Sequence, residues 1–225
     1  RVNYQPQGLS DWGALGGVIG KLAGSYWEVA AIEGIDTPPG SDQMKHMGAA
    51  MASFGSIPLY HLVGHTPEAP TIDAVCDPTD LDCVAINEQD IVNFYGNYGG
   101  KGEKVDVVVF SAPQLSIIEM NQVADLLEGQ KVHKDTALLV ATSPTVGADA
   151  ERLGISQRIE DAGGVVLHGM CFYQSYAREM ALANGWRRLM TNSAKLVNII
   201  GGYGYQPSLA SMEDCVASAV AGEVV

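Results

Sequence analysis

The chain has 225 residues, with 26 acidic and 13 basic side chains and a formal net charge of −13. This acidic composition excludes the basic face of a nucleic-acid-binding protein, and no apolar run approaches the roughly 20 residues that a membrane span needs. Hydrophobic residues make up 47% of the chain, which is enough for a buried core and excludes wholesale disorder.

The first hundred residues are predicted to contain short helices and strands joined by irregular connections. Ser10 and Ser41 mark the starts of two helices, the second after the Thr37–Gly40 turn. Residues 65–85 are rich in proline, aspartate and threonine, which indicates a long loop or a domain edge. The predicted helices cover residues 11–23, 42–54 and 88–95, and the predicted strands cover residues 29–32 and 57–63.

Strands and helices alternate over the rest of the chain. The run Val105–Phe110 is β-branched almost throughout, as expected for a strand buried on both faces. Ser116 and Glu119 form a capping box, and Ser143 is a cap followed by proline at the first helical position. The predicted strands are 105–110, 136–141, 165–168 and 188–190, and the predicted helices are 116–128, 144–162 with a break near Gly154, 176–184 and 211–221.

This alternation with short connections predicts an α/β protein, in which parallel sheets carry helices on both faces. We divide the chain into an α/β segment over residues 1–100 and a Rossmann-like α/β domain over residues 101–225. In such sheets, ligands bind beyond the carboxyl ends of the strands. The site residues are therefore expected in the segments that follow the strands.

Small polar or thiol groups occupy four such segments, at residues 111–114, 142–145, 169–171 and 191–195. Helix caps also favour serine, threonine and asparagine, so capping alone is the better explanation of any single segment. Four such segments converge on one sheet edge, and one carries Cys171 and another Lys195, so a functional site becomes as good an explanation as capping.

The four cysteines are too few to staple a chain of this length with disulfides, which favours reduced thiols and a cytoplasmic location. Cys171 follows a buried strand. Cys215 lies in the first turn of the last helix, where the helix N-terminus favours the thiolate that iron or zinc binds. Burial in the core is the alternative for both. Cys76 and Cys83 are interpreted as loop thiols, with a disulfide or a metal site as the alternatives.

The run Leu189–Lys195, followed by Ser211–Ala219, closely resembles the C-terminal end of aconitase X catalytic chains. Weaker matches follow the family order along almost the whole chain, at residues 13–16, 64–69, 113–119, 141–143 and 164–171. The resemblance implies an aconitase-like three-layer architecture, with α/β domains around an iron–sulfur cluster and a smaller swivel domain.

The same resemblance implies a hydro-lyase that removes water from a small hydroxy acid such as cis-3-hydroxy-L-proline or mevalonate 5-phosphate. Cys171 and Cys215 then resemble two of the three cysteine ligands of a 2Fe-2S or 4Fe-4S cluster. Ser193 and Lys195 resemble catalytic groups on the substrate side, with Lys195 as the partner of a carboxylate or phosphate. The residues that we predict to bind substrate are Ser111, Gln114, Thr142, Ser143 and Asn192.

Two departures from the family pattern bear on this interpretation. The family usually has a Pro-His pair where this chain has Pro113-Gln114, and glutamine cannot titrate. The chain also covers only the C-terminal half to two-thirds of a catalytic chain. The third cysteine ligand and the swivel domain are therefore expected in a partner subunit or N-terminal to Arg1. We expect one part of a larger enzyme, inactive by itself, without nucleic-acid or membrane partners.

Two other hypotheses remain open at this point. A truncated or degenerate relative that acts as an assembly or regulatory subunit would keep the fold and lose the chemistry, and Gln114 motivates this alternative. A Rossmann-like small-molecule-binding domain with buried cysteines is the second alternative.

Overall fold

The computed structural model describes residues 1–77, 79 and 82–225, and the chain divides into two compact units. Unit 1 comprises Arg1–Asn97 and unit 2 comprises Tyr98–Val225. Within the described residues, no helix combines the length and the apolar character needed to cross a bilayer.

Unit 1 is built on two helices of 15 residues each that pack along each other, together with a small parallel sheet. Its elements are α1 (Leu9–Ala23), β1 (Ala30–Ile32), α2 (Ser41–Gly55), β2 (Tyr60–Leu62), the 3-10 turn η1 (Ile72–Ala74) and α3 (Glu88–Gly96). Strands β1 and β2 pair in parallel, with Ala31 opposite His61. Three residues of the predicted irregular stretch, at 78, 80 and 81, lie outside the described residues.

The predicted helix caps of unit 1 are displaced by one or two residues. Ser10 was expected to cap α1, but Gly8 holds the extended N-cap conformation and Ser10 is buried inside the helix. Gly40, not Ser41, precedes α2, and the Gly40 N–H donates to the side chain of Gln43. A glycine can take the extended cap conformation as readily as a serine, so the helices begin earlier than the serines indicated.

Glycines allow α1 and α2 to approach each other closely. A Cβ added at Gly16 would overlap the backbone carbonyl of Met47, and one added at Gly55 would overlap the carbonyl of Gly20. The helix backbones are therefore in direct contact. Phe54 of α2 and Phe94 of α3 pack in a T-shaped arrangement in the same core, with ring centroids 5.3 Å apart.

Gly16→Ala is therefore expected to destabilise unit 1 by about 1–3 kcal/mol, because the added methyl group meets fixed backbone and cannot be accommodated by a rotamer change. Urea denaturation followed by tryptophan fluorescence measures this, since Trp12 is buried in α1. The control is Gly96→Ala at the end of α3, where an added Cβ meets nothing within 4 Å. Equal stability of the two variants would contradict the close-contact explanation.

Unit 2 contains a five-stranded, fully parallel sheet in the order β5-β4-β3-β6-β7. Its strands are β3 (Val107–Leu115), β4 (Ala137–Thr142), β5 (Val165–His168), β6 (Arg188–Thr191) and β7 (Gln206–Leu209). Its helices are α4 (Ile117–Leu126), α5 (Pro144–Arg152), α6 (Ile155–Asp161), α7 (Ala177–Asn184), α8 (Ala194–Ile200) and α9 (Met212–Ala221), with 3-10 turns η3 (Phe172–Gln174) and η4 (Gly201–Tyr203).

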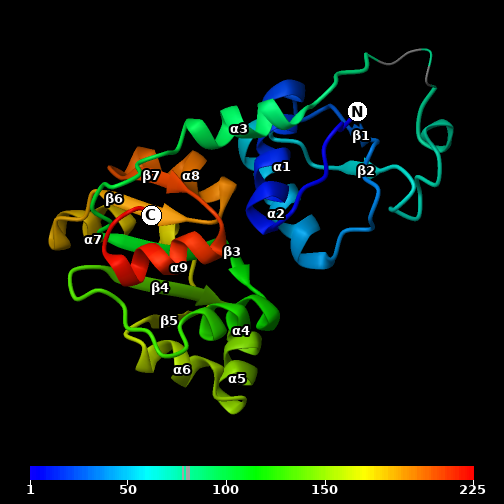
Figure 1. The fold of residues 1–225 in the computed structure, drawn as a ribbon. Helices are drawn as coiled ribbons and strands as arrows, with labels where there is room; N and C mark the ends of the chain where they lie inside the picture. The colour runs from blue at the N-terminus through cyan, green and yellow to red at the C-terminus, as the bar shows by residue number, and fades with distance from the viewer. Residues whose placement is uncertain (78, 80–81) are drawn as a thin grey trace. The chain divides into compact units, whose positions relative to one another are not determined.

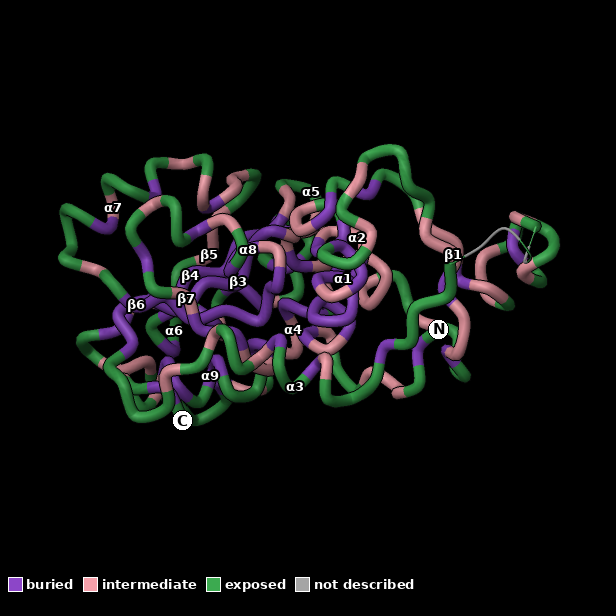
Figure 2. The backbone as a smooth tube through the Cα atoms, turned by 90° about the horizontal axis from the view of Figure 1, so that it is seen from above, coloured by how far each residue is buried: buried purple, intermediate pink, exposed green. Residues whose placement is uncertain are grey.

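The strand order makes this a doubly wound sheet. The chain runs from β3 outward to β5, then returns to β6 on the other side of β3 and continues to β7. Right-handed crossovers then place the helices of the two halves on opposite faces. Helix α4 packs with α6 and with α9, while α7 and α8 pack with η3 and η4. Figure 2 shows α9 and α7 on opposite sides of the buried strands. The predicted α/β architecture is confirmed.

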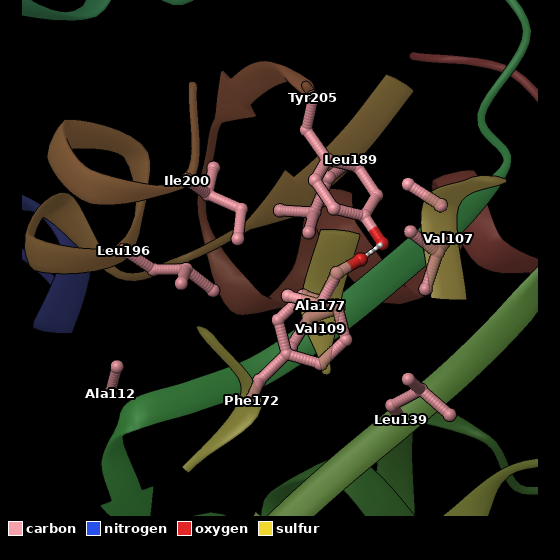
Figure 3. Packing of buried hydrophobic residues seen from close by; sticks show 11 residues of the cluster. Val107, Val109, Ala112, Leu139, Phe172, Ala177, Leu189, Leu196, Ile200 and Tyr205 are labelled. Carbon is pink, nitrogen blue, oxygen red and sulfur yellow. Dashed lines mark hydrogen bonds between the residues drawn. The ribbon is translucent and has the colours of Figure 1, made fainter. Parts of the chain in front are cut away.

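The core on the α7–α8 side is formed by alternate residues of the strands and by the apolar faces of these helices. Val107 and Val109 of β3 and Leu189 of β6 meet Leu196 and Ile200 of α8. Figure 3 shows this packing, in which the hydroxyl of Tyr205 donates to the carbonyl of Ala177 over 2.9 Å. The hydrogen bond satisfies the phenol inside an apolar cluster and fixes the start of α7.

Several local signals in unit 2 are confirmed. The hydroxyl of Ser116 accepts from the amide of Glu119, whose carboxylate accepts from the amide of Ser116. Ser143 and Ser211 cap α5 and α9. The predicted break near Gly154 is present, since this residue has φ 74° between α5 and α6.

Two elements of unit 2 were not predicted from the sequence, and one strand is longer than predicted. Helix α8 and strand β7 were not predicted, because the glycine-rich stretch 201–204 and Pro207 interrupt their patterns. Proline is tolerated in β7 because this strand lies at the edge of the sheet. Strand β3 runs to Leu115 rather than ending at Phe110.

A polar cluster joins the amino ends of β3, β6 and β7. The carboxylate of Asp106 accepts from the amides of Arg187 and Arg188 and from the ammonium of Lys104. The buried guanidinium of Arg188 donates to Ser208 over 3.0 Å and pairs with Glu103. Burial raises the pKa of Asp106, but Lys104 and the two amides outweigh this effect and hold its pKa below the usual range.

Because the pKa of Asp106 is lower in the folded protein, its contribution to stability is present above the unfolded pKa, near about 4, and is lost as the pH falls. Asp106→Asn should therefore lower the unfolding free energy at pH 7 and flatten its decline toward acidic pH. Urea denaturation at several pH values tests this. Asp149→Asn, which removes an exposed pair with Arg152, is the control and should change little. Parallel pH profiles for wild type and Asp106→Asn would refute the assignment.

Candidate functional site

The winding of unit 2 changes direction between β3 and β6, and this switch point determines where a ligand can bind. In open α/β sheets, the crevice lies outside the carboxyl ends of the strands at such a point. The predicted segments 111–114 and 191–195 end or follow these two strands. The topology therefore brings the predicted substrate groups of β3 and β6 to one edge.

The last residues of β3 depart from the regular hydrogen-bonding register with β4. Val107 to Phe110 pair in order with β4, the register then shifts, and Leu115 pairs with Thr142. Within this extension, Ala112 has φ 56° and is joined to Pro113 by a cis peptide bond. Carbonyl groups that leave a ladder need other partners when they are buried.

Three hydrogen bonds connect this extension to the neighbouring segments. The hydroxyl of Ser193 donates to the carbonyl of Ala112 over 2.6 Å, and the hydroxyl of Thr142 donates to the carbonyl of Leu115 over 2.7 Å. The amide of Gln114 donates to the carbonyl of Met170 over 3.1 Å. All four segments that the sequence singled out are thus connected through the end of β3.

Two buried polar atoms at the switch point lack a partner among the described residues. They are the hydroxyl oxygen of Ser111 and the side-chain nitrogen of Asn192. Ser111 is 1% exposed and Asn192 is 2% exposed. A buried polar group is normally hydrogen-bonded, because leaving it unpaired costs about 1–3 kcal/mol. Two such atoms at the ends of adjacent strands indicate a place where a ligand or another part of the protein supplies the partners.

The other predicted polar residues have defined roles within the fold. Ser193 was predicted to be catalytic, but its hydroxyl donates to Ala112 and accepts from the amide of Leu196. Thr142 is fully buried and holds Leu115, and Ser143 accepts from the amide of Val146 as the cap of α5. The hydroxyl groups of Ser193, Thr142 and Ser143 thus each bind backbone, although that of Ser143 only accepts.

Lys195 lies in the first turn of α8, immediately after the Asn192-Ser193 pair. It is partly buried, and no carboxylate among the described residues pairs with it. A cation beside unsatisfied donors at a strand end suits an anionic group of a ligand.

The two predicted metal ligands differ in their surroundings. Cys171 is partly exposed, follows β5 and precedes η3. Cys215 is fully buried in α9, with its sulfur 4.0 Å from the carbonyl of Ala210. Burial raises the pKa of the Cys215 thiol, and the negative charge of Asp214 adds to this effect.

Cys171 precedes η3 and Cys215 lies in α9, and these two elements pack on opposite faces of the sheet. Both elements begin at the edge of the sheet that is formed by the carboxyl ends of the strands. A common metal would therefore lie over this edge. Across residues 1–77, 79 and 82–225, no three His, Cys, Asp or Glu side chains gather into a metal-binding group. Cys76 and Cys83 are free thiols, as interpreted.

One titratable pair was not recognised from the sequence. In unit 1, the ring of His61 in β2 lies 3.0 Å from the carboxylate of Glu68. The amide of Glu68 itself and then His61 lower the pKa of this carboxyl group. The sequence does not indicate this pair, because the two residues are seven positions apart. A turn stabilised by the hydrogen bond from the Gly64 amide to the Ala69 carbonyl brings their side chains together.

A surface cavity of about 680 Å³ lies away from the switch point, at the amino ends of β6 and β7. Arg178, Trp186 and Arg187 line it, together with the glycine-rich stretch 201–204. None of the predicted site residues lines it, and Arg178 already donates to the carbonyl of Gly202 over 2.9 Å. The unsatisfied groups and the topology both favour the switch point as the functional site.

Comparison with known families gives matches over both units. Residues 1–96 match the family model of the aconitase X second domain, and residues 105–221 match that of the aconitase X third domain. The chain is 33% identical over 193 residues to the phosphomevalonate dehydratase large subunit of Methanothermobacter thermautotrophicus, a match that covers 86% of this chain and 45% of that protein.

It is also 30% identical over 199 residues to the cis-3-hydroxy-L-proline dehydratase of Pseudomonas aeruginosa, covering 87% of this chain and 34% of that protein. The crystal structure of Thermococcus kodakaraensis aconitase X in its holo-form superposes with a TM-score of 0.85 at 26% identity, over 97% of this chain and 53% of that one. The chain therefore spans about half, or less, of the length of these relatives.

Two of the serine caps of unit 2, Ser143 and Ser193, provide a test of the β3 extension. Ser143→Ala removes a cap alone and should cost about 1 kcal/mol. Ser193→Ala removes a cap and the bond to Ala112, so it should cost about 1–3 kcal/mol more, because a buried carbonyl loses its partner. Urea denaturation of both variants measures the difference. Equal losses would mean that the bond to Ala112 contributes nothing.

Proposed function

The chain belongs to the aconitase X family, and we propose that it forms the part of a hydro-lyase that binds a small hydroxy acid at the switch point of unit 2. The observation that carries this proposal is the pair of unsatisfied buried groups on Ser111 and Asn192. They lie at the ends of the two strands that flank the predicted crevice, and Lys195 follows them.

The chemistry of these groups suits a carboxylate or a phosphate. The hydroxyl of Ser111 and the amide of Asn192 can donate hydrogen bonds, and the ammonium of Lys195 adds a positive charge. The names of the similar proteins include a phosphomevalonate and a cis-3-hydroxy-L-proline dehydratase, and both substrates carry an acidic group. In this role, Lys195 holds the anionic group, while Ser111 and Asn192 orient it.

Ser193 and Thr142 then act indirectly. By holding the carbonyls of Ala112 and Leu115, they fix the backbone that presents Ser111 and Gln114. A positioned frame matters because a binding group displaced by about 1 Å can cost about two orders of magnitude in rate. The proton-abstracting base is not among the groups that we assign here. In our proposal, a swivel domain on a small partner subunit supplies it.

We also propose an iron–sulfur cluster as the cofactor, with Cys171 and Cys215 as two of its ligands. Thiols are the donors that such clusters take, and Cys171 is partly exposed at the carboxyl edge of the sheet. Cys215 is fully buried, so it fits this role only after its covering atoms move. When bound, a cluster with an open iron position supplies a Lewis acid for the departing hydroxyl group. The remaining ligands would come from a complementary chain or segment.

The test is the iron and acid-labile sulfide content of the chain, purified without oxygen together with its complementary subunits. We expect stoichiometric iron and sulfide in the wild type and dehydration of one of the two hydroxy acids. Cys171→Ala and Cys215→Ala should lose the iron, because a cluster cannot tolerate the loss of a thiolate ligand.

Cys83→Ala is the matched control, since this thiol is exposed in the irregular stretch, and it should retain the iron. A folded wild-type complex without iron and sulfide would reject the cluster. Retention of iron by Cys215→Ala alone would show that Cys215 is a core residue.

One observation favours a non-catalytic subunit as the second candidate function. The amide of Gln114 and the hydroxyl of Ser193, at two positions predicted for the active site, are both hydrogen-bonded within the fold. A complex that contains iron but dehydrates neither acid would support this alternative.

A further inference from the structure

We propose that Gln114 is a positioning residue that fixes the loop carrying Cys171 to the extended end of β3. Its side-chain nitrogen donates to the carbonyl of Met170 over 3.1 Å, across 56 positions of sequence. Met170 immediately precedes Cys171, so this hydrogen bond holds the peptide unit that leads into the cysteine. The role differs from the substrate contact predicted for Gln114 from the sequence.

The loop needs such a contact because it leaves the sheet at an edge strand. Its amide at Gly169 donates to the carbonyl of Thr142 over 2.8 Å, which anchors its start, and Phe172 is buried in the core at its end. Gly169 is exposed with φ 69°, so the chain turns away from β5 at this point. Gln114 reaches the segment between these two anchors.

Gln114, the other partner in this contact, lies in a segment that is held in place by further hydrogen bonds. The extension that carries Gln114 is itself held by Ser193 from the β6 side and by Thr142 from β4. A continuous chain of hydrogen bonds therefore runs from the segment with Asn192 and Lys195, through the end of β3, to the loop with Cys171. This chain sets the position of the thiol relative to the unsatisfied groups of the switch point.

An amide is suited to this task because it donates at every pH. A histidine or a carboxylic acid at this position would change its donor capacity as it titrates, whereas glutamine keeps its NH₂ group.

The significance of this contact for catalysis rests on the proposed function, in which the thiol of Cys171 binds the metal. The mechanical role does not depend on a bound metal.

The experiment measures alkylation of the individual cysteines by iodoacetamide with mass spectrometry, in the full chain under reducing conditions. Gln114→Glu is close to isosteric and replaces the donor by an acceptor. Loss of one hydrogen bond should raise the population of the open loop, and with it the labelling rate of Cys171, about five- to tenfold. Cys83 and Cys215 serve as internal references for an exposed and a buried thiol.

Gln157→Ala is the matched control, because it removes a glutamine that bonds to Asp161 on the surface of α6. Gln114→Ala provides a second variant, which should show the same selective increase. An unchanged rate at Cys171, or an equal rise at all three thiols, would overturn the positioning role. The proposed cluster and the proposed role of Gln114 can be rejected independently of each other. Absence of iron from the wild-type complex rejects the cluster, whereas unchanged labelling with iron present rejects the role of Gln114.

Discussion

The organisation of unit 2 at its functional edge depends on the backbone carbonyls at the end of β3. Strand β3 is the first strand of the doubly wound sheet, and it leaves the ladder where the winding changes direction. Its buried carbonyls need donors, and side chains from the neighbouring strand ends supply them. The same interactions that satisfy the backbone therefore assemble the edge of the sheet into one frame.

This arrangement separates hydroxyl groups that bind backbone from buried polar atoms that have no partner among the described residues. Ser193 and Thr142 direct their hydroxyl groups at backbone, whereas Ser111 and Asn192 keep buried polar atoms without partners in the described part of the chain. The cost of such unpaired groups is acceptable where a ligand supplies the missing bonds. Residue types alone do not reveal the distinction, because serine, threonine and asparagine serve equally well as caps and as ligand contacts.

The two cysteines predicted as metal ligands, Cys171 and Cys215, also differ in their surroundings. A helix N-terminus lowers the pKa of a thiol, and burial raises it. At Cys215 burial dominates, since the sulfur is enclosed and Asp214 and Glu213 add negative charge. Cys171 stays accessible because its loop leaves an edge strand. The two elements share the carboxyl edge of the sheet, which is also where the unsatisfied groups of the switch point lie.

The sequence by itself determined the α/β class, most elements of unit 2 and the four segments at the strand ends. Those features follow from local signals, such as the β-branched run at Val107–Val109, the capping box at Ser116 and the break at Gly154. It did not determine strand order, the extension of β3 or the pairing of His61 with Glu68. These features depend on contacts between distant segments, and only the folded chain decides which hydroxyl binds backbone and which thiol is enclosed. Local patterns specify elements because neighbouring residues share one helix or strand, whereas a site is made by whichever strand ends the winding of the sheet brings together.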